Sequence, residues 1–392
     1  MKRDYSRNIP LLYVYSVLMK RVTIPIITLY YLSYHLTYTQ IGILAAVTGL
    51  TCMATNMHLG VFADLHGKRW ALALQGLFGG ASMLFLYFGE GFFPYLFAGI
   101  CYGIAGGFLL GARETLLYDS LVEMKQTSQF KQYYGRMVLY SHIINALLLI
   151  AIPVLYVYDT KLPFLIAIVM FAVSVIVALL LVEPPLTKHS KISFSTYNEK
   201  IMETFRVIRG NKKLFSLLLL STVLGAFATS GADYYQPLLK AAGLPVALFG
   251  LVYFGMRIVR GIGAEITYRL EKYLTTYKLV LLCLAMLLAS FVGLAWGVLA
   301  LVVFGMIFSQ MEDGMSKIVL TDEISKSVRT NRTTLLSVAS LTESLLNAFL
   351  GFVFGVLADN VGVQAMFGYA LVLFCVCVIG MGFVRKIRPT AH

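Results

Sequence analysis

Long apolar runs follow one another along almost the whole chain, and they constrain its fold more than any other feature. We count twelve, at about residues 10–34, 39–59, 70–89, 93–117, 136–157, 162–183, 214–238, 243–264, 277–295, 298–320, 333–357 and 364–384. A helix of about 20 apolar residues crosses the roughly 30 Å of hydrocarbon in a bilayer. Only 13% of the residues are charged, about half the share in soluble domains. The sequence predicts an all-α membrane protein with twelve transmembrane helices, and excludes soluble enzymes and nucleic-acid-binding modules.

The distribution of positive charge predicts which side of the membrane each loop occupies. If the N-terminus is cytoplasmic, only Lys161 and Lys240 of the 32 Lys and Arg fall in outside loops. Four more lie within predicted spans, and all the others lie on the inside. Cytoplasmic loops are enriched in Lys and Arg, so both termini are predicted to be cytoplasmic. The net charge of +13 thus indicates topology and contact with anionic headgroups.

A polar interval at 187–213 divides the chain into two similar parts. We expect an N-terminal six-helix bundle at 1–186, a cytoplasmic linker at 187–213 and a C-terminal six-helix bundle at 214–392. Apolar residues recur every three or four positions in the linker, which predicts an amphipathic helix on the membrane surface. Short sequences also recur at an offset near 200, for example Leu117-Tyr-Asp119 and Leu320-Thr-Asp322. This repetition predicts pseudo-symmetric halves, the plan of many secondary transporters.

The segment between the second and third spans reads Gly60-Val-Phe-Ala-Asp64-Leu-His-Gly67-Lys68-Arg69. We expect Gly60 to let the second span approach a neighbour, and Gly67 to permit a tight turn. Asp64 is expected to pair with a helix N-terminus or an arginine, and Lys68 and Arg69 to anchor at the headgroups. The spacing of these residues resembles the signature loop of the major facilitator superfamily, which implies a gating role for the loop.

A second segment, Asn331-Arg-Thr-Thr-Leu-Leu-Ser337, resembles a stretch common in bacterial facilitators of the drug-exporter type. The resemblance implies alternating access, a small-molecule substrate, a proton as coupling ion, a monomer and the bacterial inner membrane. Two antiporter features are missing, because Gly99 stands where the family has an arginine and the fifth span lacks the glycine–proline motif. The absence of these features does not favour proton antiport, but the resemblance implies proton-coupled export of drugs or amphipathic metabolites as the family default, and this is our prediction. The alternative is a carrier for a polar or anionic metabolite, working by uptake or facilitated exchange.

Several ionisable residues fall inside the predicted spans, where a charge costs about 3 kcal/mol or more. The candidates for substrate binding or proton coupling are Lys20, Arg21, Asp233, Arg257, Glu312, Asp313 and Glu343. Lys20 and Arg21 would project about 100° apart on a helix, so one of them is expected to face the pathway. Glu343 is expected to be a lone carboxylate suited to reversible protonation, whereas an arginine could hold Glu312 and Asp313 ionised.

The sequence contains no motif for enzymatic catalysis or metal binding. It contains no Gly-x-Ser-x-Gly, no His-Glu-x-x-His and no phosphate-binding loop, so we predict that the protein is not an enzyme. All five cysteines lie within predicted spans, so none of them is positioned to form an extracellular disulfide or to bind a metal. We therefore expect no metal and no cofactor.

Overall fold

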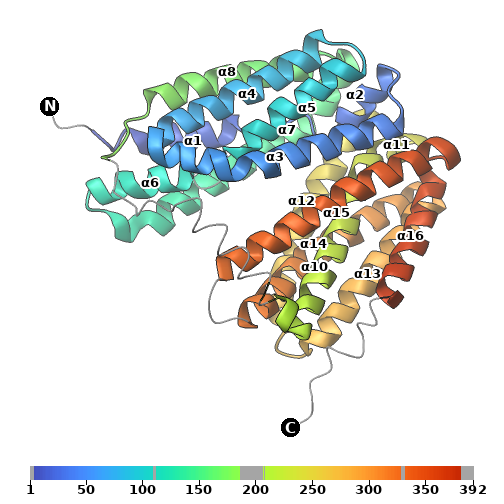
Figure 1. Cartoon of the computed structure of the whole chain (residues 1–392). Coiled ribbons are helices and arrows are strands. Elements are labelled where there is room, and N and C mark those ends of the chain that lie inside the picture. Colours follow the sequence, from blue (N-terminus) through green and yellow to red (C-terminus); the bar gives the residue numbers. More distant parts are fainter. Residues whose placement is uncertain (1–3, 109–111, 186–205, 207, 328–331, 381–392) are drawn as a thin grey trace. The chain divides into compact units, whose positions relative to one another are not determined.

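The computed structural model describes residues 4–108, 112–185, 206, 208–327 and 332–380 (Figure 1). These residues form helices and connecting turns, with no strand among them. The chain divides into two compact units. Unit 1 consists of residues 1–36, 43–189 and 246–251, and unit 2 of residues 37–42, 190–245 and 252–392.

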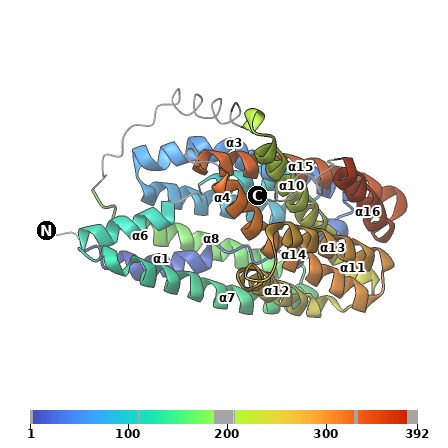
Figure 2. The same cartoon turned by 90° about the horizontal axis from the view of Figure 1, so that it is seen from below.

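The helices of the first half lie mainly in unit 1. They are α1 (Asn8–Leu18), α2 (Ile27–Ser33), α3 (Tyr38–His66), α4 (Lys68–Phe88), α5 (Phe92–Gly107), α6 (Ala112–Glu123), α7 (Phe130–Tyr158) and α8 (Leu162–Leu180), with a 3₁₀ turn, η1, at Thr127–Gln129. In this unit α1 lies beside α7 and α8 (Figure 2). Helices α4 and α8 also run side by side (Figure 1).

The helices of the second half lie mainly in unit 2. They are α10 (Lys212–Ser230), η2 (Gly231–Tyr234), α11 (Tyr235–Ala241), η3 (Val246–Leu248), α12 (Phe249–Leu270), α13 (Thr276–Trp296), α14 (Leu299–Lys326), α15 (Arg332–Val361) and α16 (Val363–Gly380). Helix α10 packs against α14 and α15, while α13 packs against α14 and α16.

The predicted spans correspond to helices of the structure, although three of them, the first, the seventh and the tenth, depart from a plain apolar helix. Ten helices among the described residues are long and apolar enough to cross a membrane. The tenth predicted span is α14, whose charged residues make it less apolar than these ten. The first span was expected to be continuous but is broken into α1 and α2 by residues 19–26. Pro25 explains part of this break, because proline lacks an N–H group and disfavours helical geometry in the preceding residue.

The seventh span and the linker were also predicted to be helical. The seventh predicted span is also interrupted, since the short 3₁₀ helix η2 separates α10 from α11. The predicted amphipathic linker helix falls almost entirely on residues 186–205 and 207, which lie outside the described part of the chain. Its structure therefore stays a prediction.

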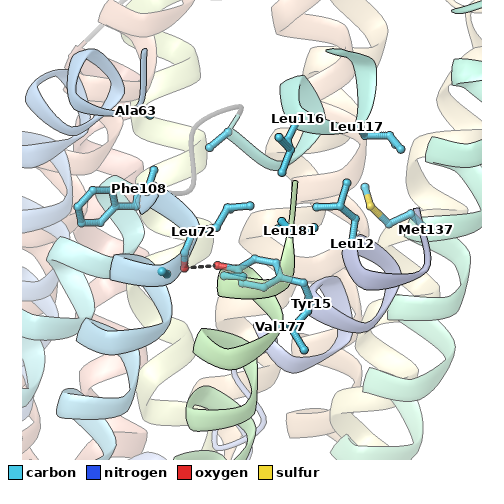
Figure 3. Packing of buried hydrophobic residues seen from close by; sticks show 14 of the residues in the cluster. Leu12, Tyr15, Ala63, Leu72, Phe108, Leu116, Leu117, Met137, Val177 and Leu181 are labelled. Carbon is cyan, nitrogen blue, oxygen red and sulfur yellow. Dashed lines mark hydrogen bonds between the residues drawn. The ribbon is translucent and has the colours of Figure 1, made fainter. Parts of the chain in front are cut away.

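Unit 1 has a buried core that joins six of its helices, α1, α3, α4, α6, α7 and α8 (Figure 3). Leu12, Leu116 and Leu181, from α1, α6 and the end of α8, are almost fully buried there. The hydroxyl of Tyr15 donates a hydrogen bond to the carbonyl of Leu72 at 2.8 Å, as drawn in Figure 3. Apolar contact and a satisfied polar group together fix the position of α1 against α4.

A buried asparagine joins the two ends of unit 1. The Nδ2 of Asn8 donates to Ser120 Oγ and to the carbonyl of Val182, each at 2.8 Å. The backbone N–H of Val182 donates in return to Asn8 Oδ1, also at 2.8 Å. The start of α1 is thereby bonded both to α6 and to the segment that follows α8.

Candidate coupling and gating sites

Unit 2 contains a connected group of charges on three helices. Asp313 of α14 is buried, and its carboxylate lies 2.6 Å from Nη2 of Arg260 on α12. Nζ of Lys317, one turn further along α14, lies 3.0 Å from the same carboxylate. Lys317 is also 3.8 Å from Glu343 Oε1 on α15. We call Arg260, Asp313, Lys317 and Glu343 the charge chain.

Glycines allow the helices to approach closely at the charge chain. A Cβ atom at Gly314 would lie 2.3 Å from the carbonyl oxygen of Arg260, so only glycine fits where α14 meets α12. On α10, a Cβ at Gly225 would lie 2.5 Å from the carboxyl carbon of Glu343. Small residues in α14 and α10 thus bring Arg260 to Asp313 and leave room for the Glu343 side chain.

Glu312 precedes the charge chain on α14 and is completely buried, with 0% of its surface exposed. It forms no ion pair among the described residues, and neither carboxylate oxygen has a well-aligned hydrogen bond, although Ser316 lies beside it. Lys317 and Glu343 are close enough to act on it electrostatically. A buried carboxylate without a counter-ion is costly, whereas a neutral carboxyl group is much less so.

The structure changes the expected division of roles among these acids. Glu343 is not a lone carboxylate, because Lys317 lies 3.8 Å away and the side chain is partly exposed. Glu312 is the acid that lacks an ion pair. Asp313 is held by an arginine, as anticipated, and the arginine is Arg260. The sequence analysis missed Lys317 as a partner, although its position four residues after Asp313 on one helix is a recognisable signal.

The remaining candidates of unit 2 lie outside the charge chain. Arg257 is exposed on α12, and it forms no ion pair in the part of the chain that the structure describes. It interacts with Asp313 only at longer range. Asp233 is half-buried in η2, at the interruption of the seventh span. Tyr253 of α12 lies near both Asp233 and Arg257.

Lys20 and Arg21 lie in the break between α1 and α2 of unit 1, so the expected 100° separation on a helix is wrong. Helix α1 ends at Leu18, and both side chains are half-buried in the non-helical segment. The guanidinium of Arg21 lies over the ring of Tyr102, 4.6 Å from its centre, a cation–π contact. Its Nε is buried without a hydrogen-bond partner.

The signature loop forms a tight connection between α3 and α4. Gly67 has φ 103°, a left-handed conformation that glycine adopts without strain. Glu183, just after α8, accepts hydrogen bonds from the backbone N–H groups of Lys68 and Arg69, each at 2.8 Å. A carboxylate here satisfies free N–H groups of the first turn and complements the positive end of the α4 dipole.

Lys68 has a different environment from the one expected. Its ammonium pairs with Asp119 of α6, and the two side chains are only 7% and 12% exposed. The expected position at the headgroups is therefore wrong for Lys68. Sequence analysis missed Asp119 and Glu183 as partners, although Asp119 stood out in the internal repeat and Glu183 is the last residue of the sixth predicted span.

Other residues of the signature loop make few contacts. A Cβ atom at Gly60 would meet nothing within 4 Å, so no close helix approach occurs there in this structure. Asp64 is exposed and has no hydrogen bond or ion pair with another described residue. Arg69 is half-buried, with its guanidinium over the ring of Trp70 at 5.7 Å.

Comparison with known proteins identifies the family. Residues 11–341 match the family model of the Major Facilitator Superfamily, and the chain belongs to this family. It is 23% identical over 381 residues to the uncharacterized MFS-type transporter YxaM of Bacillus subtilis (strain 168), with 93% of this chain and 92% of that protein covered.

Solved structures agree in fold. A crystal structure of the nucleoside transporter NupG has a TM-score of 0.84 at 14% identity, and the match covers 97% of this chain and 100% of that one. A D-xylose-proton symporter has a TM-score of 0.66 at 14% identity, covering 98% and 97%. The protein is therefore a multi-pass membrane transporter of this family, and not an enzyme.

Proposed function

We propose that this transporter exports drugs or amphipathic metabolites in exchange for protons, and that the acids of unit 2 carry the proton. The observation that supports this proposal is the completely buried Glu312, which has no counter-ion and lies next to the charge chain. Alternating access moves a solute uphill only if a second species binds the two states with different affinity. A carboxyl group that is buried in one state and accessible in the other provides such a difference for a proton.

The balance of charges supports one proton per cycle. Glu312, Asp313 and Glu343 are three acids, and Arg260 and Lys317 are the two cations that contact them. The group is neutral when one of the three acids is protonated, and carries one negative charge when none is. Because an unbalanced charge is costly in a low-dielectric interior, proton uptake favours closure of this region around the acids.

Lys317 is the cation suited to respond to the proton. Its side chain is 45% exposed and reaches both Asp313 and Glu343, whereas Arg260, among the described residues, forms an ion pair with Asp313 and not with Glu343. Protonation of Glu343 would leave Lys317 with Asp313, and protonation of Glu312 would remove the charge that most needs a counter-ion. We propose Glu312 as the proton carrier and Glu343 as the acid that senses its state.

Proteoliposomes provide the test. Ethidium serves as an amphipathic cation and p-aminohippurate as an amphipathic anion, and uptake of each is followed after a pH step. With an acidic lumen, proton antiport accumulates the substrate, and Glu312→Gln is expected to abolish this accumulation while leaving counterflow exchange intact. Glu343→Gln and Asp313→Asn are the companion variants, and Glu265→Gln on the exposed face of α12 is the control. If Glu312→Gln, Glu343→Gln and Asp313→Asn all still accumulate the substrate after the pH step, the proton-coupled proposal is refuted.

The second candidate is uptake or facilitated exchange of a polar or anionic metabolite. It is favoured by Arg21, whose guanidinium contacts a tyrosine ring and forms no ion pair with another described residue. In this case p-aminohippurate, not ethidium, is the substrate, and accumulation requires an acidic exterior or does not occur against a gradient. The direction of the effective pH step therefore separates the two functions.

We further propose a monomer in the bacterial inner membrane with both termini in the cytoplasm. The asymmetric distribution of Lys and Arg supports this orientation. Reporter domains fused at Lys213 and His392 are expected inside, and one fused at Asp159 outside. An outside signal at His392 would contradict the even number of spans.

A further inference from the structure

A cavity of about 510 Å³ lies next to the signature loop in unit 1. Its lining among the described residues comes from the end of α3, the first turn of α4 and the end of α8, namely His66, Arg69, Trp70, Leu180, Leu181, Val182 and Glu183. The proposed function does not use this cavity. It lies at the end of the helices that the charge distribution assigns to the cytoplasmic side.

The polar groups of the cavity favour an anion. Nε of Arg69 is buried and has no hydrogen-bond partner, and its guanidinium covers the ring of Trp70. The carboxylate of Glu183 already accepts two backbone N–H groups of α4, so it is directed toward the helix terminus. The charge of Lys68 is balanced by Asp119. Arg69 therefore remains as the cation of this cavity that has no ion pair, with His66 exposed beside it.

The surface that leads to the cavity is apolar and exposed. On α4, the exposed side chains of Trp70, Leu77 and Leu84 recur every seven residues, which places them along one stripe. On α8, the exposed residues Val169, Val173, Ile176 and Leu180 recur at spacings of four, three and four. Because α4 and α8 pack side by side (Figure 1), the two stripes belong to one helix pair, and one end of each, Trp70 or Leu180, lines the cavity.

We propose that this cavity binds the phosphate of an anionic phospholipid of the cytoplasmic leaflet, with phosphatidylglycerol as the probe. The acyl chains would lie along the apolar stripes. Trp70 would lie at the membrane interface, and the guanidinium of Arg69 would bind the phosphate. Tryptophan is typical of the headgroup level, and arginine is well suited to bind phosphate oxygens. The apolar stripes favour a lipid over free phosphate. The inference rests on the proposed cytoplasmic location of this end and is independent of proton coupling.

The chain has only two tryptophans, Trp70 and Trp296, which allows a direct measurement. The variant Trp296→Phe retains Trp70 as the only fluorophore, and Trp70→Phe retains Trp296 at the end of α13. Each full-length variant is reconstituted into phosphatidylcholine vesicles containing a minor fraction of brominated lipid, either phosphatidylglycerol or phosphatidylcholine. Bromine quenches a tryptophan that it contacts, so preferential quenching reports which lipid is bound.

We expect brominated phosphatidylglycerol to be enriched next to Trp70 by about fivefold, the factor that a single basic residue contributes near an anionic surface. Trp296 should show no preference. Adding Arg69→Gln to Trp296→Phe should remove the enrichment, whereas Lys272→Gln, in the corresponding loop of unit 2, should leave it unchanged. Arg69→Lys should retain part of it, which separates loss of charge from misfolding.

Three results would overturn the proposal: equal quenching of Trp70 by both lipids, enrichment that survives Arg69→Gln, or displacement of the lipid by millimolar inorganic phosphate. The last result would identify a site for free phosphate. The readout needs no transport, so failure of the proton-coupled function would leave it unaffected.

Discussion

The two units place corresponding charges in different environments. In unit 1, Lys68 and Asp119 form a buried pair between α4 and α6, and Glu183 caps α4 from a position 115 residues away. In unit 2, Asp322, which corresponds to Asp119 in the repeat, pairs with Lys326 on its own helix, and the side chains are 44% and 67% exposed.

The beginning of α13 shows the same contrast with that of α4. Thr275 accepts the N–H of Lys278 at 3.5 Å, so this helix is capped by its own preceding residue. The hydrogen bond from Lys326 to Asp322 also raises the pKa of the lysine, which remains a local effect at the surface. Unit 2 also has links between helices at this end, because Lys213 of α10 lies 3.9 Å from Glu323 of α14 and Thr276 of α13 donates to the same carboxylate. The Lys213 side chain is 62% exposed, however, whereas the pair of Lys68 and Asp119 in unit 1 is buried.

The largest effect is expected from breaking the buried pair of unit 1. Lys68→Ala leaves Asp119 buried without a counter-ion, and should lower the free energy of unfolding by about 3–5 kcal/mol. Thermal unfolding of the purified protein in detergent measures the change. The matched substitution in unit 2, Lys326→Ala, should leave the midpoint unchanged because that pair is exposed.

A double variant makes this test more specific. Lys68→Ala with Asp119→Ala removes both charges, and should recover part of the loss because no buried charge remains. Equal destabilisation by Lys68→Ala and Lys326→Ala would show that the two units do not differ in this way.

A smaller effect is expected at the turn of the signature loop. Gly67→Ala puts a side chain at φ 103° and brings its Cβ to 3.1 Å from the Glu183 carboxyl carbon. We expect a loss of about 1–3 kcal/mol, the usual cost of a strained backbone position. Gly362→Ala in unit 2 is the control, because it has a similar φ of 84° but nothing within 4 Å of the new Cβ. If both variants unfold at the same temperature, contact with Glu183 is unimportant.

The smallest effect is expected at Asp64, which is exposed and forms no hydrogen bond or ion pair with another described residue. Asp64→Asn should leave thermal stability unchanged and slow transport by about fivefold, which corresponds to about 1 kcal/mol in the barrier. Substrate binding should be retained, since the residue lies at the end of α3. Rates of counterflow and equilibrium binding of the same probe test this, and loss of binding in a folded variant would contradict it.

The sequence allowed prediction of the helices and the family, because hydrophobic length, charge asymmetry and the signature loop are properties of consecutive residues. The position of Lys68 could not be predicted in this way. Its burial depends on the packing of α4 against α6, which brings in Asp119 from 51 residues away. The roles of Glu312 and Glu343 likewise depend on how α14 and α15 are rotated about their axes, which brings Lys317 of α14 to Glu343 of α15. Helix rotation is not evident from hydropathy.

The buried bonds of Asn8 have a consequence for biosynthesis. Helix α1 has 11 residues and a length of about 17 Å, too short to span the hydrocarbon by itself. Its partners α6, α7 and α8 are synthesised later, and Val182, to which Asn8 is bonded, is among the last residues of the first half. The ribosome must therefore complete the sixth span before α1 can form these hydrogen bonds. The part of unit 1 that precedes the linker is then able to assemble around this asparagine while the second half is still being translated.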